Sequence, residues 1–375
     1  MHPSTRNLAS VFVSALMLLV VLALVPIPAH ADTAYAQTNL VSNSSGATTT
    51  DPSLVNPWGI SASATSPFWV SDEGTSVATL YQGNGTQVAL VVSIPSSDPT
   101  GQVFNSAGSS NFNSDAFLFA TLSGDIDGWR GALGTNAEIE VLGQGASYTG
   151  LALANNGSDN YLYAANFASG AIDVFYKSFS RTLLPGGFLD PNLPAGYAPF
   201  NIQNINGKLY VEYVQVDSIT HLPVPGTGIV DVFDANGNLL QRLATGGALN
   251  DPWGVTLASS NFGQYSNDLL IGNFGNGEIN AYDPVTGAFL GTLEDVSGNP
   301  IVNSGLLALE FGNGYSNADP NALYFTAGTS LTGSGTGLFG DITATDKTTP
   351  APEPGTLVMI GGGLLGLMGA RRRNV

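Results

Sequence analysis

Residues 161–177 read YLYAANFASGAIDVFYK, and this stretch decides the fold. An apolar segment comes first, a short turn of small residues around Gly170 follows, and a second segment ends in aromatic side chains. Residues that alternate in type every second position, bounded by turn residues, are typical of β-strands. The stretch therefore predicts a β-hairpin.

The same pattern recurs at five other places along the chain. Clear copies start at Phe68, Phe117 and Leu269, and looser copies start at Lys208 and Ala322. With the copy at 161, the six starts are separated by 49, 44, 47, 61 and 53 residues. Within several copies a further strand-like segment follows a turn. A repeat of about fifty residues made of strands predicts an all-β, six-bladed β-propeller with four strands in each blade.

The two ends of the repeat region complement each other. After GLFGDIT at 337–343 the chain runs into a Thr/Pro linker, so the sixth blade lacks an outer strand. The segment YAQTNLVS at 35–42 alternates like a strand and belongs to no other blade. Pairing it with the sixth blade would close the ring and leave no open sheet edge there. We therefore expect one propeller domain over residues 37–346, closed by the N-terminal strand.

The charge of this body limits its partners. Between residues 36 and 350 there are 26 acidic residues and six basic ones, a formal charge of about −20. Such a surface repels phosphate backbones, which argues against nucleic-acid binding. The chain has no cysteine, so disulfides and thiolate chemistry are absent.

The N-terminus has the features of an export signal. Residues 8–25 are apolar, two prolines follow, and Ala29-His30-Ala31 places small residues where signal peptidase cleaves. A second such site ends at Ala36. The sequence predicts a signal peptide over residues 1–36, cleaved after Ala31 or Ala36. The alternative is an uncleaved membrane anchor, because eighteen residues nearly span a bilayer.

The C-terminus has the features of a membrane segment. Residues 355–370 carry no charge and would rise about 24 Å as a helix at ~1.5 Å per residue. The arginines that follow would hold that end on the cytoplasmic side. We expect a linker over 347–354 and a transmembrane sorting helix with an arginine tail over 355–375. A plain single-pass anchor is the alternative.

Two resemblances follow from these motifs. Pro352-Glu353-Pro354-Gly355, an apolar segment and then Arg371, Arg372 and Arg373 resemble the PEP-CTERM sorting tail of bacterial exported proteins. That resemblance implies an exosortase, a membrane enzyme that recognises the Pro-Glu-Pro motif, removes the helix and passes the protein towards the envelope or the extracellular matrix.

The body resembles an uncharacterised family of exported bacterial propellers related in style to NHL-repeat proteins. The stretches that carry this second resemblance are NPWGI (56–60), GWRGALG (128–134), LPAGYAPFNIQNINGKLYV (193–211), DPWGV (251–255) and GNFGNGEINAYDP (272–284). It implies the fold and gives no information on chemistry.

Few residues offer catalytic chemistry. After signal removal His221 is the one histidine left, which excludes histidine metal triads. It lies in a Pro-rich insertion without an evident orienting acid, so a loop position is favoured over a catalytic base. No catalytic residue is predicted.

Asp125 and Asp127 are candidate metal ligands. Residues two apart on an extended strand point to the same side, so the two carboxylates could contribute to a calcium site with further ligands. Two solvated acids at a hairpin are the alternative interpretation.

Trp58 and Trp253 hold equivalent positions in the two Pro-Trp-Gly repeats, and the innermost strand of a blade is expected to follow each. They would either pack within the blades or stack on sugars near the central mouth. Trp129 and Arg130 form a similar candidate.

These observations predict an exported, non-catalytic propeller with a binding or structural role at the cell surface or in the extracellular matrix. Its ligand would be a polysaccharide or a protein. A calcium-dependent hydrolase or lactonase is the alternative. An enzyme should gather three or more acids or asparagines at one channel end, whereas a binding protein should show an aromatic or polar rim.

Overall fold

The computed structural model describes residues 33–328 and 335–347, and these form strands and four short 3-10 helices. The 3-10 helices are η1 (Glu73–Thr75), η2 (Phe112–Ser114), η3 (Gly131–Leu133) and η4 (Gly263–Tyr265). In this part of the chain no helix is long and apolar enough to cross a membrane. The cleavage site at Ala31, the Pro-Glu-Pro motif and the arginine tail lie outside the described residues.

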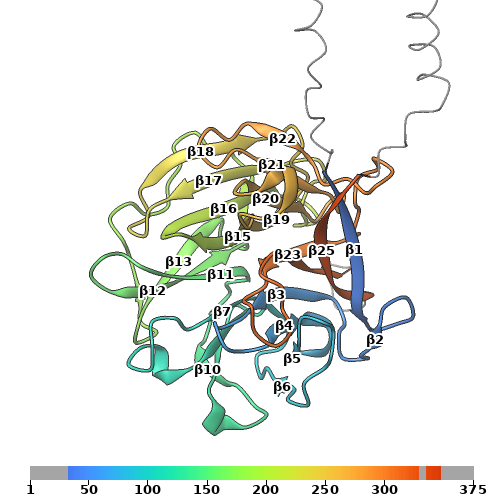
Figure 1. Cartoon of the computed structure of the whole chain (residues 1–375). Coiled ribbons are helices and arrows are strands. Elements are labelled where there is room, and N and C mark those ends of the chain that lie inside the picture. Colours follow the sequence, from blue (N-terminus) through green and yellow to red (C-terminus); the bar gives the residue numbers. More distant parts are fainter. Residues whose placement is uncertain (1–32, 329–334, 348–375) are drawn as a thin grey trace, which may run out of the picture. The chain divides into compact units, whose positions relative to one another are not determined.

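Six sheets form a ring of blades (Figure 1). The innermost strands are β3 (Pro57–Ser61), β7 (Pro99–Phe104), β11 (Tyr148–Asn155), β15 (Tyr197–Ile205), β19 (Pro252–Leu257) and β23 (Leu306–Phe311). The second strands are β4 (Phe68–Asp72), β8 (Phe117–Thr121), β12 (Asn160–Asn166), β16 (Lys208–Gln215), β20 (Leu269–Asn273) and β24 (Leu323–Gly328).

The outer half of each blade completes the sheets. The third strands are β5 (Val77–Tyr81), β9 (Ile126–Trp129), β13 (Ala171–Tyr176), β17 (Ile229–Phe233), β21 (Ile279–Tyr282) and β25 (Gly337–Asp346). The outer strands of the first five blades are β6 (Val92–Ser93), β10 (Glu138–Val141), β14 (Arg181–Thr182), β18 (Leu239–Thr245) and β22 (Phe289–Thr292). Each repeat start found in the sequence lies within one residue of the start of a second strand, so the predicted six-bladed propeller is confirmed.

The N-terminal strand completes the sixth blade. β1 (Thr33–Ser42) lies next to β25 in the sheet order β2-β1-β25-β24-β23 (Figure 1). The two-residue strand β2 (Thr49–Thr50) pairs with β1 in parallel at the outer edge. The predicted ring closure is confirmed, and β1 begins at Thr33, ahead of the expected domain boundary at residue 37.

One strand prediction was wrong. The innermost strands do not follow the Pro-Trp-Gly triplets, because β3 and β19 begin at the prolines of those triplets, Pro57 and Pro252. The preceding residues, Asn56 and Asp251, have φ angles of 49° and 51° and turn the chain into the strand. Proline is tolerated as the first residue of a strand, where its missing N–H costs no ladder bond.

The innermost strands pack closely around the axis. A Cβ at Gly59 of β3 would lie 2.6 Å from the carbonyl oxygen of Thr100, and a Cβ at Gly101 of β7 would lie 2.4 Å from the amide nitrogen of Leu151. Both distances are shorter than a carbon can approach, so glycine is required where neighbouring blades meet backbone to backbone.

The hydrophobic core lies between neighbouring blades. Leu118 of β8 packs in one cluster with Leu151 of β11 and Leu162 of β12, which joins the second blade to the third. Val230 and Val255 join the fourth blade to the fifth in the same way. Burying one such side chain contributes about 2 kcal/mol, so each blade is stabilised by its neighbours.

The start of β1 is held firmly in the fifth and sixth blades. Tyr35 is 1% exposed, its ring lies 4.9 Å from that of Phe262, and its hydroxyl donates to the Phe262 carbonyl at 3.2 Å. Its amide donates to the carbonyl of Glu294 at 2.8 Å. Cleavage after Ala36 would remove all of these contacts.

We therefore predict that signal peptidase cleaves after Ala31, so that the exported protein begins at Asp32 and keeps all of β1. N-terminal sequencing of the exported protein tests this. An exported form that begins at Gln37 and still unfolds cooperatively at the same temperature would contradict the prediction.

Candidate functional site

Aromatic side chains fill one end of the central channel. The ring of Trp58 in the first blade lies 6.2 Å from that of Phe200 in the fourth blade and 6.1 Å from that of Trp253 in the fifth. The first and fourth blades face each other across the ring, so this contact spans the axis. Trp58 is 1% exposed and Trp253 is 4% exposed. Both tryptophans are thus buried at the closed end of the channel, where they meet between blades and not within one blade.

The other end of the channel is open and polar. A cavity of about 280 Å³ lies where the innermost strands end. Its polar lining comes from five blades: Ser61, Gln102, Ser106, Gln203, Asn204, Thr256 and Glu310. Burial raises the pKa of Glu310 to about 8, although the backbone N–H of Ala62 bonds its carboxyl group. Sequence reasoning missed this cavity, because its residues are far apart in the chain and belong to no motif.

This channel end lacks the set of acids or asparagines expected for the alternative function, a calcium-dependent enzyme. Glu310 is the one acid and Asn204 the one asparagine among the residues that line the cavity. The criterion stated for an enzyme was three or more such groups. The polar rim agrees instead with the criterion for a binding protein.

A third site lies between the third and fourth blades, on the same side as the tryptophan-filled end. A pocket of about 460 Å³ is lined by Phe167, Tyr197 and His221 together with small residues. Phe167 also packs against the Trp58 cluster, which places the pocket beside the closed channel end. This pocket has an aromatic rim and is open to solvent.

His221 in this pocket lacks the partner of a catalytic base. Its side chain is exposed, and the hydrogen bonds found among the described residues join no acid to its imidazole. The nearby Asp217 carboxylate accepts from the amides of Ile219 at 3.0 Å and Thr220 at 2.7 Å, and thereby caps its own turn. The imidazole can therefore stack or donate a hydrogen bond to a ligand.

Asp125 and Asp127 bond different segments of the chain. Both oxygens of Asp127 accept from Ser96, from its hydroxyl at 2.7 Å and its amide at 3.0 Å. Asp125 accepts from the amide of Gly143 at 2.7 Å. Burial raises the pKa of Asp127 to about 6. Each carboxylate thus holds a neighbouring loop.

Asp127 also lies at a repeated blade position. In four blades the third strand carries a polar residue opposite the third-from-last residue of the second strand: Thr79, Asp127, Asp173 and Asn280. Thr79, Asp173 and Asn280 form hydrogen bonds within their own blades, whereas Asp127 bonds Ser96 in the loop that leads from the first blade to the second. The hydrogen bonds made by the polar residue at this position therefore help to stabilise the blades.

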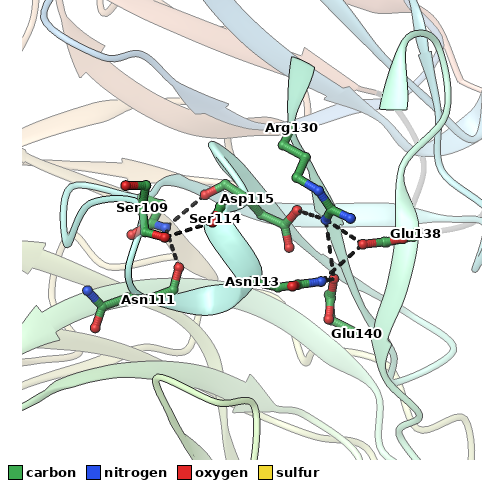
Figure 2. A network of polar contacts seen from close by, with 9 residues as sticks. Ser109, Asn111, Asn113, Ser114, Asp115, Arg130, Glu138 and Glu140 are labelled. Atoms are coloured by element: carbon green, nitrogen blue, oxygen red, sulfur yellow. Dashed lines mark hydrogen bonds and ion pairs between the residues drawn. The ribbon is translucent and has the colours of Figure 1, made fainter. Parts of the chain in front are cut away.

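Arg130 lies at the centre of an acidic cluster (Figure 2). Its Nη1 atom is 2.7 Å from Asp115 Oδ1, bonds Glu138, and is 3.9 Å from Glu140. Asn113 donates to Glu138 at 3.1 Å and to Glu140 at 2.9 Å. Burial raises the pKa of Asp115 to about 7. The three carboxylates are close enough to hold a metal ion, and the Arg130 guanidinium already pairs with two of them, Asp115 and Glu138.

The neighbouring Trp129 packs against the first blade and also bonds its own blade. Its ring lies 4.7 Å from that of Trp69, and its indole N–H donates to the Gly134 carbonyl at 2.9 Å. The side chains of Trp129 and Arg130 therefore both contact other residues of the protein. Glu138 and Glu140 alternate on β10 as Asp125 and Asp127 alternate near β9, so the same sequence signal could have found them.

Residues 350–373 match the family model of the PEP-CTERM protein-sorting motif, which confirms the resemblance of the tail. Two proteins of Acanthamoeba polyphaga mimivirus are similar to most of the chain. Uncharacterized protein R648 is 31% identical over 328 residues, which cover 80% of this chain and 78% of that protein. Uncharacterized protein L690 is 32% identical over 284 residues, which cover 69% and 74%.

The comparison with solved structures gives matches of low sequence identity. A protein of unknown function from Bacteroides thetaiotaomicron matches with a TM-score of 0.52 and 13% identity, covering 84% of this chain and 77% of that chain. Virginiamycin B lyase from Staphylococcus aureus matches with a TM-score of 0.47 and 13% identity, covering 83% and 99%. At this identity the likeness concerns the fold alone.

Buried acids are a general feature of the blades. Burial is the main cause that raises the pKa of each of them: Asp115, Asp231 and Asp251 to about 7, Asp127 to about 6, Glu310 to about 8, and Asp72 and Glu212 well above the ordinary value. In an unfolded chain such carboxyls titrate near pH ~4. The folded protein therefore holds more protons between about pH 4 and pH 8, and its free energy of unfolding falls as the pH rises through this window.

We predict that the thermal midpoint is highest near about pH 5 and falls by several degrees towards about pH 8, because these acids lose their protons in the folded state. Calorimetry across this range measures it. Asp251→Asn should flatten the pH dependence of the thermal midpoint, because an amide does not titrate. The substitution should be tolerated, since Asn56 holds the equivalent position in the other Pro-Trp-Gly repeat. A midpoint that rises from about pH 5 to about pH 8 would contradict the prediction.

Proposed function

The chain belongs to the family of the mimivirus proteins R648 and L690. We propose that it is an exported β-propeller that binds a polysaccharide without catalysis. Its place of action is the cell surface or the extracellular matrix. The PEP-CTERM tail implies export and a membrane-anchored sorting intermediate, which supports this placement.

The pocket between the third and fourth blades carries the proposal. Its volume of about 460 Å³ lies in the range of ligand pockets, and Phe167, Tyr197 and His221 give it aromatic faces. Such faces stack on the apolar faces of sugar rings. The formal charge of the body, about −20, repels anionic polymers, so a neutral polysaccharide is the better ligand.

A calcium-dependent hydrolase is the less favoured alternative at the channel mouth and at Asp125 and Asp127. The channel mouth has a single acid, Asp127 is bonded to Ser96 through both oxygens, and His221 lacks an orienting carboxylate. Binding without turnover needs none of these groups.

The proposed route to the surface uses both ends of the chain. Signal peptidase releases the N-terminus. An exosortase recognises Pro352-Glu353-Pro354 and removes the helix that Arg371, Arg372 and Arg373 hold in the inner membrane. The agreement of motif, order and position with the PEP-CTERM family supports this route.

Tyr197→Ala should weaken binding of a neutral polysaccharide by about tenfold, because a stacked ring contributes about 1 kcal/mol beyond its buried area. The purified exported protein is titrated with dextran, laminarin and galactomannan, with alginate as the anionic comparison. Binding should be equal in calcium and in chelator. Tyr315→Ala, at a 45% exposed tyrosine on another loop, is the matched control. Equal binding by both variants would contradict the proposal, as would hydrolysis of the polymer.

Replacing Pro352, Glu353 and Pro354 by alanine should leave export intact and retain the uncleaved protein in the inner membrane. Cell fractionation with mass determination measures this, and Thr348→Ala in the linker is the control. Arrival of the altered protein in the medium at the mass of the processed form would refute the sorting role of the motif.

A further inference from the structure

We infer that the pocket between the third and fourth blades takes neutral sugars that carry a methyl group, such as 6-deoxyhexoses. This inference rests on the proposed function, because it names the class of sugar that the polysaccharide pocket would bind. It is carried by the small number of polar groups that the pocket offers to a ligand.

The side chains of the pocket contain few hydrogen-bonding groups. None of the described residues that line it is an acid, a lysine, an arginine or an amide. Carboxylates, guanidinium groups and amides can form several hydrogen bonds at once, and a pair of sugar hydroxyls needs such groups. The polar side chains that remain are those of Ser147, Ser169, Tyr197 and His221.

The backbone of the pocket has few donors left as well. Seven of the ten lining residues donate their backbone N–H within the protein: Ser147, Phe167, Ser169, Gly170, Tyr197, Val216 and His221. The amides of Ser147 and Ser169, for example, both donate to Asn166 Oδ1, at 3.3 Å and 3.2 Å. A sugar hydroxyl that leaves water for this pocket therefore finds few partners, and burial without a partner is unfavourable.

Small apolar groups line the pocket instead. Ala198 on β15 is buried, Val216 is half-buried, and Ala168 lies on the loop after β12. A methyl group in place of a hydroxyl or hydroxymethyl group loses no hydrogen bond here and gains apolar contact. The aromatic faces of Phe167 and Tyr197 would hold the ring of the same sugar.

Val216 belongs to an insertion in the fourth blade. Thirteen residues, 216–228, connect β16 to β17, whereas four residues connect β12 to β13 in the third blade. The Val216 amide donates to the Gly196 carbonyl at 2.8 Å, and the Gly226 amide donates to Asn250 Oδ1 at 2.7 Å. Both ends of the insertion are thereby tied to the body, so this apolar wall is in place before a ligand binds.

Calorimetric titration of the purified exported protein tests the inference with pairs of methyl glycosides that differ only in the hydroxyl of carbon 6. The pairs are methyl α-D-rhamnoside with methyl α-D-mannoside, and methyl α-L-fucoside with methyl α-L-galactoside. We expect the deoxy sugar to bind about tenfold more tightly in at least one pair, which is the effect of one small group in an apolar pocket.

Methyl 6-O-methyl-α-D-mannoside separates the two sources of a methyl group. If it binds as tightly as the rhamnoside, the pocket takes methylated sugars in general. If it binds more weakly, the pocket takes 6-deoxy sugars.

Val216→Thr keeps the shape of the side chain, adds one hydroxyl and should reduce the preference to below about threefold. Val224→Thr, in the same insertion but outside the pocket lining, is the matched control and should keep the preference. The inference is overturned if the hydroxylated sugar binds as tightly as the deoxy sugar in both pairs, or if Val216→Thr keeps the full preference.

The same titrations separate this inference from the proposed function. If dextran, laminarin or galactomannan binds and the preference for the deoxy sugar is absent, this inference alone fails. If no sugar and no polysaccharide binds, the proposed function fails with it.

Discussion

The ring depends on β1, the first strand of the described chain, which completes the last blade. Asn43, just after β1, bonds both backbone groups of Gly337 at the start of β25, through its amide at 3.3 Å and its side-chain oxygen at 3.0 Å. Tyr35 fixes the other end of β1 against the fifth blade. Since every blade buries its faces against two neighbours, an incomplete sixth blade would expose apolar surface on both sides of the gap. Ring closure therefore stabilises all six blades.

The contact across the axis decides where a ligand can enter. Trp58, Phe200 and Trp253 meet from three blades and close one channel end, so a ligand can enter the channel from the opposite mouth. The side chains that line the mouth are mainly amides, hydroxyls and aliphatic groups, with Glu310 as the single acid. The proposed polysaccharide pocket lies beside the closed end, where Phe167 packs against the Trp58 cluster.

The acidic composition has two different uses. Several acids are buried and accept hydrogen bonds that hold loops, as Asp127 does for Ser96, or they pair with arginine, as Asp115 does with Arg130. The remaining acids give the surface its negative charge. A buried carboxyl whose pKa is raised is therefore a structural feature of these blades, and its pKa alone does not identify a reactive group.

The sequence by itself determined the number of blades, the closing strand and the sorting tail. Each of these depends on local patterns: alternation with period two, turn residues and short motifs with fixed order. Tertiary structure alone decided the sites. Trp58 and Trp253 share a motif that is equally compatible with a core or a surface, and only the contact across the axis shows that they are buried. Ser61, Gln102 and Glu310 are separated by up to 249 residues. They line one cavity because every innermost strand ends at the same mouth, which no local pattern records.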